Sequence, residues 1–300
     1  METAVNCKLL LYADDSVLLV SGKNPAEIES KLSSELSSVS DWLIDNRLSL
    51  HLGKTETILF GSKSKIKSNQ SLNVVCNGTK INSCSTVKYL GAVLDQTLDC
   101  EAIASSVLSK VYGRQKFLYR KSNFLNCSTK KLVSSALVQC HYDYACSFWY
   151  SSLTKKTKSK LQVSQNRLIR YVLGLPVRTH LYTEHFKRLG WLPIDLRVDQ
   201  LKLNIMYRSL NGQSPSYICD KFTLTSNVHN HRTRSSHHSL VIPHYGSKGE
   251  HSFSVSGAKL WNNLSADIIN SNSISVFKTK VKNHLYEHMF SLEINETVYY

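Results

Sequence analysis

The chain has 300 residues, a size that allows one large domain or roughly two or three smaller ones. Its 37 Lys and Arg residues against 22 Asp and Glu residues give a formal net charge of +15, which indicates a polyanionic partner, because basic surfaces bind phosphate backbones by releasing counterions. The 8 Cys residues include no Cys-x-x-Cys pair, so zinc ribbons and disulfide-dense small scaffolds are excluded.

The N-terminal residues predict neither a signal peptide nor a membrane span. Met1–Lys8 has no apolar segment, and the next apolar run is interrupted by Asp14 and Asp15. We therefore expect an intracellular protein, nuclear or cytoplasmic, that is not secreted and has no membrane among its partners.

Residues 9–20 predict a β-hairpin. The apolar runs Leu9–Leu11 and Val17–Val20 are typical of short, fully buried strands, and they flank Tyr12-Ala13-Asp14-Asp15. Two adjacent carboxylates at the tip of a buried hairpin repel each other and lose hydration, and a hard divalent cation such as Mg²⁺ relieves both costs. The alternative is that both aspartates lie in an ordinary exposed turn, where Asp is common.

In this apolar frame, Tyr12-Ala13-Asp14-Asp15 resembles the catalytic hairpin of reverse transcriptases, and the residues that follow are similar to the reverse transcriptases of LINE-type (non-LTR) retrotransposons. The resemblance implies RNA-directed DNA polymerase activity with Mg²⁺ or Mn²⁺ in the intact enzyme. It implies an RNA template, a DNA primer and deoxynucleoside triphosphates as partners. Asp14 and Asp15 become catalytic metal ligands, and Tyr12 becomes a nucleic-acid-binding residue. The implied fold class is α+β, a partial polymerase palm followed by a mainly helical thumb and C-terminal region.

A helix is expected directly after the hairpin. Asn24 is placed to cap it, Pro25 suits its first position, and Glu27 takes the capping-box position. We expect its apolar stripe to pack on the sheet that carries the hairpin. The stripe consists of Ile28, Leu32, Leu36, Val39 and Leu43.

Leu48–Phe60 predicts a bent strand, with Gly53 at the bend and Ile58–Phe60 as its buried end. Lys54 stands at that bend. A lysine near a turn is usually solvated. The resemblance instead implies that Lys54 helps to place the incoming nucleotide, either by contacting its triphosphate or by protonating the departing pyrophosphate.

Two further strand segments follow. Asn77-Gly78 between Leu72–Cys76 and Thr79–Ile81 predicts a type I′ hairpin. Val87–Asp95 predicts one strand with a glycine bulge. By the resemblance this strand is the primer grip, in which Tyr89, Leu90 and Gly91 hold the primer end; the alternative is an ordinary strand whose Tyr89 and Leu90 are core.

From Asp99 onwards the apolar periodicity is helical, and the resemblance makes this region a thumb. The expected apolar stripes are Ile103, Val107 and Val111; Leu132, Ala136 and Cys140; and Leu161, Leu168, Ile169 and Val172, the last ended by Gly174 and Pro176. An aromatic core cluster is expected from Tyr142, Tyr144, Phe148, Trp149 and Tyr150.

The candidate phosphate contacts of this thumb are basic residues on its third helix. They are Lys155, Lys156, Lys158, Lys160, Arg167 and Arg170. The alternative is that they form a solvated face, as charge runs usually do.

The C-terminal region predicts one helix over Leu196–Leu210 and another over Ile274–Phe290. Phe253–Leu264 and the second of these helices resemble the tail that follows the thumb in some LINE-type polymerases. Between the two helices, Ser226–Glu250 loses apolar periodicity and is rich in His; its spacing matches no zinc pattern, so a flexible basic loop facing nucleic acid is favoured over a metal site. The expected division is a partial palm over residues 1–97, a thumb-like region over 98–176 and a C-terminal region over 177–300.

The residues that precede Asp14 include one acidic side chain, Glu2, so we do not expect the first catalytic Asp of a two-metal site or the fingers within this chain. We therefore expect a truncated element or a gene-model fragment that is inactive alone. Two alternatives remain. One is a non-catalytic nucleic-acid-binding protein that uses the thumb and basic tail; the other is an unrelated helical interaction protein, which leaves the charge of +15 unexplained.

Overall fold

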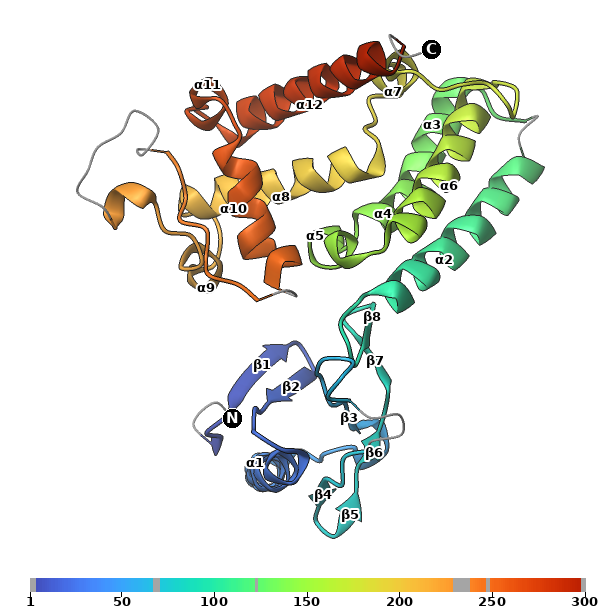
Figure 1. Ribbon diagram of the computed structural model, residues 1–300. Coiled ribbons are helices and arrows are strands. Elements are labelled where there is room, and N and C mark those ends of the chain that lie inside the picture. The colour runs from blue at the N-terminus through green and yellow to red at the C-terminus, as the bar shows by residue number, and fades with distance from the viewer. Residues whose placement is uncertain (1–3, 67–70, 122–123, 229–237, 247–248, 298–300) are drawn as a thin grey trace. The chain divides into compact units, whose positions relative to one another are not determined.

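The computed structural model describes residues 4–66, 71–121, 124–228, 238–246 and 249–297, with side chains up to residue 291 (Figure 1). The chain forms two compact units, Met1–Leu98 and Asp99–Tyr300. Short strands and one long helix make up the first unit, and helices make up the second. This mixture of helix and sheet is compatible with the expected α+β class.

Strands of the first unit occur in pairs. These are β1 (Lys8–Tyr12) with β2 (Asp15–Leu19), β3 (Glu56–Thr57) with β6 (Asn82–Ser83), β4 (Val75–Cys76) with β5 (Thr79–Lys80), and β7 (Thr86–Tyr89) with β8 (Ala92–Asp95). The β3–β6 pair is parallel and the others are antiparallel. Within the described residues, no strand joins two of these pairs into a larger sheet.

The long helix of the first unit is α1 (Pro25–Asp45), and its start confirms the predicted cap. The Asn24 side-chain oxygen accepts the backbone N–H of Glu27 at 2.9 Å. The Glu27 carboxylate accepts the backbone N–H of Lys23 at 2.9 Å, one residue before the position that a capping box uses.

The core of the first unit lies between α1 and the segment that contains β4 and β5. Leu36 is buried there with Leu72, Val74, Cys76 and Ile81. Polar groups of α1 also bind this segment: a Glu29 carboxylate oxygen accepts the backbone N–H of Asn73 at 2.9 Å, and the Ser33 hydroxyl accepts that of Val75 at 3.1 Å. The stripe therefore faces inward as predicted, but its main partner is this segment, and β2 contributes Leu18 to it.

Turn chemistry explains both hairpins near the end of the first unit. Asn77 and Gly78 have φ values of 49° and 75°, which confirms the predicted turn. The single strand predicted over Val87–Asp95 is wrong, because Leu90 and Gly91, with φ values of 44° and 81°, form a two-residue turn between β7 and β8. The sequence did not indicate this turn, since Leu rarely adopts a positive φ.

The bent strand predicted over Leu48–Phe60 is also wrong. A 3₁₀ turn, η2 (Leu52–Lys54), and the two residues of β3 replace it, and Phe60 is 38% exposed. Leu50, Leu52 and Leu59 do pack against the core of the unit. These leucines therefore pack into the core although they do not belong to a β-strand.

The second unit is helical. Its longer helices are α2 (Glu101–Arg120), α3 (Cys127–Ser134), α6 (Lys155–Leu173), α7 (Thr183–Leu189), α8 (Ile194–Leu210), α10 (Phe253–Asn262) and α12 (Ile274–Thr297). Shorter pieces are the π-helical η4 (Ser135–Gln139), α4 (Cys140–Asp143), α5 (Cys146–Trp149), η5 (Tyr150–Ser152), α9 (Ser216–Cys219), η6 (Thr225–Asn227), η7 (Gly249–His251) and α11 (Ala266–Ile269). The helices predicted over Leu196–Leu210 and Ile274–Phe290 are confirmed as α8 and α12, and α10 lies within Phe253–Leu264, where no helix was predicted.

Helix α8 is central to this unit and contacts α4, α5, α6, α10 and α12 (Figure 1). Aromatic rings fill its interface with α10 and α12: Phe277 stacks on Tyr207 with ring centroids 4.4 Å apart, and on Trp261 at 5.8 Å. The stripes predicted for α2 and α6 are buried, and Gly174 ends α6 with a φ of 68°. None of the helices in the described part of the chain is both long and apolar enough to cross a membrane.

The stripe predicted from Leu132, Ala136 and Cys140 is wrong. These residues are exposed, Leu132 by 71%, whereas the buried positions are Ser134, Val138 and Tyr142. The buried set keeps the four-residue spacing of the predicted one but is offset by two residues, so it lies on the opposite side of the helix.

The predicted aromatic cluster is confirmed for three of its members. Tyr142, Trp149 and Tyr150 are buried, but Tyr144 and Phe148 are 54% and 45% exposed. Residues 229–237, the centre of the predicted His-rich loop, lie outside the described residues.

Candidate active site and nucleic-acid interface

The Tyr12–Asp15 segment lies at the tip of the β1–β2 hairpin, as predicted. Tyr12 pairs with Asp15, and the strand register continues to Lys8 opposite Leu19. Ala13 and Asp14 form the turn. Ala13 has a φ of 51°, a left-handed conformation that costs a non-glycine residue on the order of 1 kcal/mol. A tight, strained turn thus presents two consecutive carboxylates.

The predicted burial of this hairpin is wrong. Asp14 and Asp15 are exposed, and Leu11 and Tyr12 are 49% and 64% exposed. A two-stranded sheet leaves a face open unless other elements cover it. From this hairpin, Leu18 reaches the core of the unit. Because both carboxylates are exposed to solvent, the desolvation cost that we expected a cation to relieve does not arise in this structure.

Asp14 and Asp15 offer carboxylate oxygens, which are the ligand type that Mg²⁺ and Mn²⁺ prefer. The described residues contain no group of three or more His, Cys, Asp or Glu side chains placed to hold a metal ion. The carboxylate oxygens of Asp14 and Asp15 are therefore suitable ligands for a hard cation, but these two residues do not make a complete two-metal site.

The other predicted residues of the first unit lie on separate elements. Lys54 is exposed at the end of η2, and its backbone N–H donates to the carbonyl of His51. Tyr89 and Leu90 are half-buried at the β7–β8 turn, where Gly91 is exposed. In the described part of the chain, no hydrogen bond or ion pair joins Lys54 to either aspartate of the hairpin.

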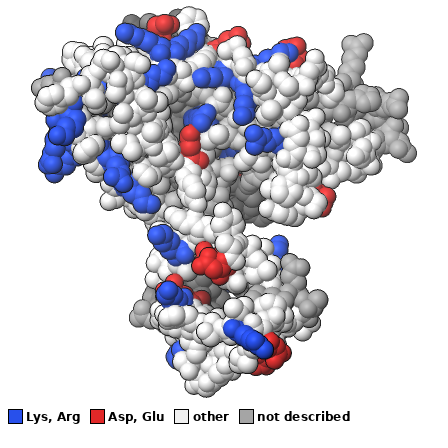
Figure 2. All heavy atoms as spheres, turned by 180° about the vertical axis from the view of Figure 1, so that it is seen from behind, with Lys and Arg blue, Asp and Glu red and all other residues white. Residues whose placement is uncertain are grey.

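Helix α6 carries the six predicted phosphate contacts. Four of them are exposed, and the other two make contacts within their own unit. Lys155, Lys156, Lys160 and Arg167 are exposed. Figure 2 shows Lys and Arg side chains prominent over the helical unit on the face displayed.

The remaining two are engaged within the unit. The Lys158 ammonium lies 5.2 Å from the centre of the Tyr150 ring and donates to the carbonyl of Ser151 at 3.3 Å. Burial lowers the pKa of Lys158, against the opposing effect of Asp195 and Asp199. The Arg170 Nε donates to the carbonyl of Thr179 at 2.9 Å.

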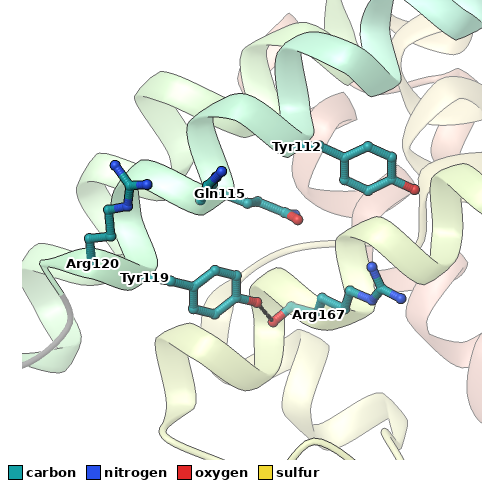
Figure 3. Close-up of a pocket in the computed structure, with 6 residues that line it drawn as sticks. Tyr112, Gln115, Tyr119, Arg120 and Arg167 are labelled. Carbon is teal, nitrogen blue, oxygen red and sulfur yellow. Dashed lines mark hydrogen bonds between the residues drawn. The ribbon is translucent and has the colours of Figure 1, made fainter.

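A pocket between α2 and α6 was not predicted from the sequence. It has a volume of about 480 Å³ (Figure 3). Its lining residues are Tyr112, Gln115, Lys116, Tyr119, Arg120 and Arg167. The sequence does contain a pattern that could have indicated this pocket. Tyr112, Lys116 and Tyr119 are spaced three or four residues apart, so they share a face of α2.

Two curated proteins are similar to this chain in sequence. A "Retrovirus-related Pol polyprotein from type-1 retrotransposable element R1" of Nasonia vitripennis is 25% identical over 201 residues, which is 65% of this chain and 59% of that protein. An "RNA-directed DNA polymerase from mobile element jockey" of Drosophila funebris is 23% identical over 168 residues, 55% of this chain and 18% of that protein.

The chain is related to the polymerases of non-LTR, LINE-type retrotransposons. This confirms the resemblance that Tyr12-Ala13-Asp14-Asp15 indicated. The chain spans about three fifths of the R1 relative and less than a fifth of the jockey relative. No protein-family model matches the chain, and no solved structure matches it.

Proposed function

We propose that this chain is the back part of an RNA-directed DNA polymerase of a LINE-type retrotransposon. It contributes the catalytic hairpin of a polymerase palm and a helical unit that binds nucleic acid. The observation that carries this proposal is the placement of Tyr12-Ala13-Asp14-Asp15 at a tight hairpin turn, in a chain related over more than half its length to LINE-type polymerases.

In the complete polymerase, we assign Asp14 as a ligand of Mg²⁺ or Mn²⁺ and Asp15 as its supporting neighbour. The metal, when bound, stabilises the negative charge that develops on the transferring phosphoryl group. Lys54 is exposed on the same unit and is our candidate for contacting the triphosphate. The Tyr89–Gly91 turn is our candidate for holding the primer end, because its exposed Gly91 allows a close approach of another backbone.

The helical unit is our candidate for binding the template–primer duplex. Lys155, Lys156 and Lys160 lie exposed on the first turns of α6 and can reach phosphates. Lys158 and Arg170 bind groups of their own unit, so we assign them the role of positioning this helix.

The experiment that tests the proposal is primer extension by a chimera. The fingers and preceding palm segments of a LINE-type reverse transcriptase are joined to this chain, and extension on an RNA template is measured with and without Mg²⁺. We expect no detectable extension by the chain alone and Mg²⁺-dependent extension by the chimera. Asp14→Ala should lower the rate of extension at least about 100-fold, because a removed electrostatic contact to the reacting groups costs that much. Lys54→Ala should slow extension and leave duplex binding unchanged.

The matched control is Asp41→Ala, which removes an exposed carboxylate from α1 and should leave extension unchanged. Extension that survives Asp14→Ala would contradict the assignment of the hairpin as the active site.

A second candidate function is a non-catalytic nucleic-acid-binding protein. The observation that favours it is that the basic α6 face and the α2–α6 pocket both belong to the helical unit, which does not contain Asp14. A chimera that binds the template–primer duplex but extends no primer would support this candidate over the first.

A further inference from the structure

We propose that the pocket between α2 and α6 binds unpaired nucleotides of a single-stranded nucleic acid, with bases against the rings of Tyr112 and Tyr119 and phosphates at Lys116, Arg120 and Arg167. This inference rests on the proposed function, because it names the form of nucleic acid that the helical unit takes in addition to a duplex.

The charge of the pocket favours a polyanion. Its lining contains three cationic side chains and no carboxylate. Helix α6 has six Lys or Arg residues and no Asp or Glu, and the one acidic residue of α2, Glu101, accepts hydrogen bonds from Thr154 and Thr157 at the start of α6. Among the described residues, no ion pair uses Lys116, Arg120 or Arg167. Their charges are therefore available to phosphates.

The two tyrosines present accessible ring surface, and contacts with α6 orient the ring of Tyr119. Tyr112 and Tyr119 are 41% and 44% exposed. The Tyr119 hydroxyl donates to the carbonyl of Arg167 at 3.1 Å, and its ring makes an edge contact with Tyr171 at 4.9 Å between centroids. Figure 3 shows this hydroxyl reaching from α2 to the backbone of α6. The ring is thus oriented before any ligand arrives, which lowers the entropy cost of binding.

The floor of the pocket is rigid as well. Gln115 is buried between the two tyrosines of α2, and its side-chain amide donates to the carbonyl of Ser164 at 2.7 Å. Ser164 also exchanges a hydrogen bond with Tyr142 at 2.7 Å. These contacts hold α2 against α6, so the spacing of the two helices at the pocket is set by the core of the unit.

Exposed rings beside cations match the chemistry of unpaired nucleotides. The bases of a duplex stack on one another and are not accessible to a protein ring, whereas single-stranded bases stack on aromatic side chains while basic groups follow the backbone. A volume of about 480 Å³ lies within the range of small-ligand sites. An acidic peptide would satisfy the cations but would leave the rings unused, so the observations favour nucleic acid.

The test measures the affinity of the whole chain for fluorescent oligonucleotides by anisotropy. The probes are single-stranded oligoadenylate, an abasic strand of equal length, a blunt duplex, AMP as competitor, and an oligoglutamate peptide. We expect oligoadenylate to bind at least about 5-fold more tightly than the abasic strand, because each stacked base contributes to affinity. Tyr112→Leu should weaken oligoadenylate binding at least about 5-fold and leave duplex binding unchanged.

Two matched controls lie outside the pocket. Phe117→Leu removes a ring that is 54% exposed on another face of α2, and Arg208→Gln removes an exposed charge from α8. Phe117→Leu should leave oligoadenylate binding unchanged, and Arg208→Gln should weaken it less than Arg167→Gln does.

Equal affinity for the abasic strand, an equal effect of Phe117→Leu and Tyr112→Leu, or equal binding of oligoglutamate would overturn the pocket proposal. If duplex binding persists in those cases, the proposed polymerase function stands. Competition by AMP at concentrations similar to the oligonucleotide would assign the pocket to free nucleotides and would also overturn it.

Discussion

The β1–β2 hairpin and the core of the helical unit bury their apolar residues to very different degrees. In the helical unit, Trp149, Phe277 and Leu168 are almost completely buried. In the first unit, the strands of the β1–β2 hairpin leave Leu11 and Leu19 49% and 40% exposed. A helix satisfies its backbone hydrogen bonds within itself, whereas a strand needs neighbours on its edges and a layer on its face.

The difference indicates that the hairpin depends on further structure to cover its apolar residues. The candidate catalytic carboxylates belong to a two-stranded hairpin with an open apolar face, and the candidate nucleic-acid contacts belong to a packed helical core. For the proposed function, this contrast predicts that nucleic-acid binding needs the helical unit alone and that catalysis needs additional sheet to support the hairpin.

Two substitutions to alanine, one in each region, test this difference in burial and should give the largest effect of the predictions made here. Phe277→Ala removes a fully buried ring that stacks on Tyr207 and Trp261, so we expect it to lower the free energy of unfolding by about 3–5 kcal/mol. Leu11→Ala, at a half-exposed position, should lower it by less than about 1 kcal/mol. Urea unfolding followed by circular dichroism measures both, and equal losses would refute the contrast between the two regions.

A smaller effect is expected on the pH dependence of stability, and it arises from a carboxylate in the helical unit. Burial raises the pKa of Asp199 on α8 from 3.8 to about 6, although Lys202, Lys158 and His288 oppose this and Asp195 adds to it. The folded state therefore binds this proton more tightly, and stability falls as the pH rises from about 4 to about 6. We expect Asp199→Asn to stabilise the protein at pH 7 by up to about 3 kcal/mol and to have little effect near pH 4.

The control for this prediction is Asp220→Asn, which neutralises an exposed carboxylate of the same unit that does not contribute to the pKa shift of Asp199, and it should leave the pH dependence of stability nearly unchanged. Urea midpoints measured between pH 4 and pH 7 supply the comparison. A stabilisation by Asp199→Asn that is the same at both ends of this range would show that ionisation of Asp199 is not its cause.

Much of the fold was predictable where a local rule determines it. Asn24, Pro25 and Gly174 mark helix ends through backbone chemistry, and Asn77-Gly78 marks a turn in the same way. The Leu90–Gly91 turn was not predictable, because Leu rarely adopts a positive φ. The buried face of the α3–α4 segment was not predictable either, because the polar Ser134 lies on it and the apolar Leu132 does not.

The candidate site was predictable in its residue types and not in its surroundings. The letters Tyr12-Ala13-Asp14-Asp15 indicated the hairpin, but burial depends on elements distant in the sequence, and the hairpin is exposed. Likewise the basic run of α6 gave no sign that Lys158 turns inward to Tyr150. The tyrosines of the α2–α6 pocket were missed because their importance arises from the packing of two helices.

The most direct test of the central claim, that nucleic-acid binding and the catalytic hairpin belong to different units, is the salt dependence of binding to a template–primer duplex. Without divalent metal, we expect the logarithm of the binding constant to fall linearly with the logarithm of salt concentration, with a slope of about −0.9 per phosphate contacted. Replacing Lys155, Lys156 and Lys160 together by Gln should make that slope shallower by about 2 to 3, and replacing Asp14 and Asp15 by Asn should leave it unchanged. A slope near zero, or one that the three lysine replacements do not alter, would contradict the account.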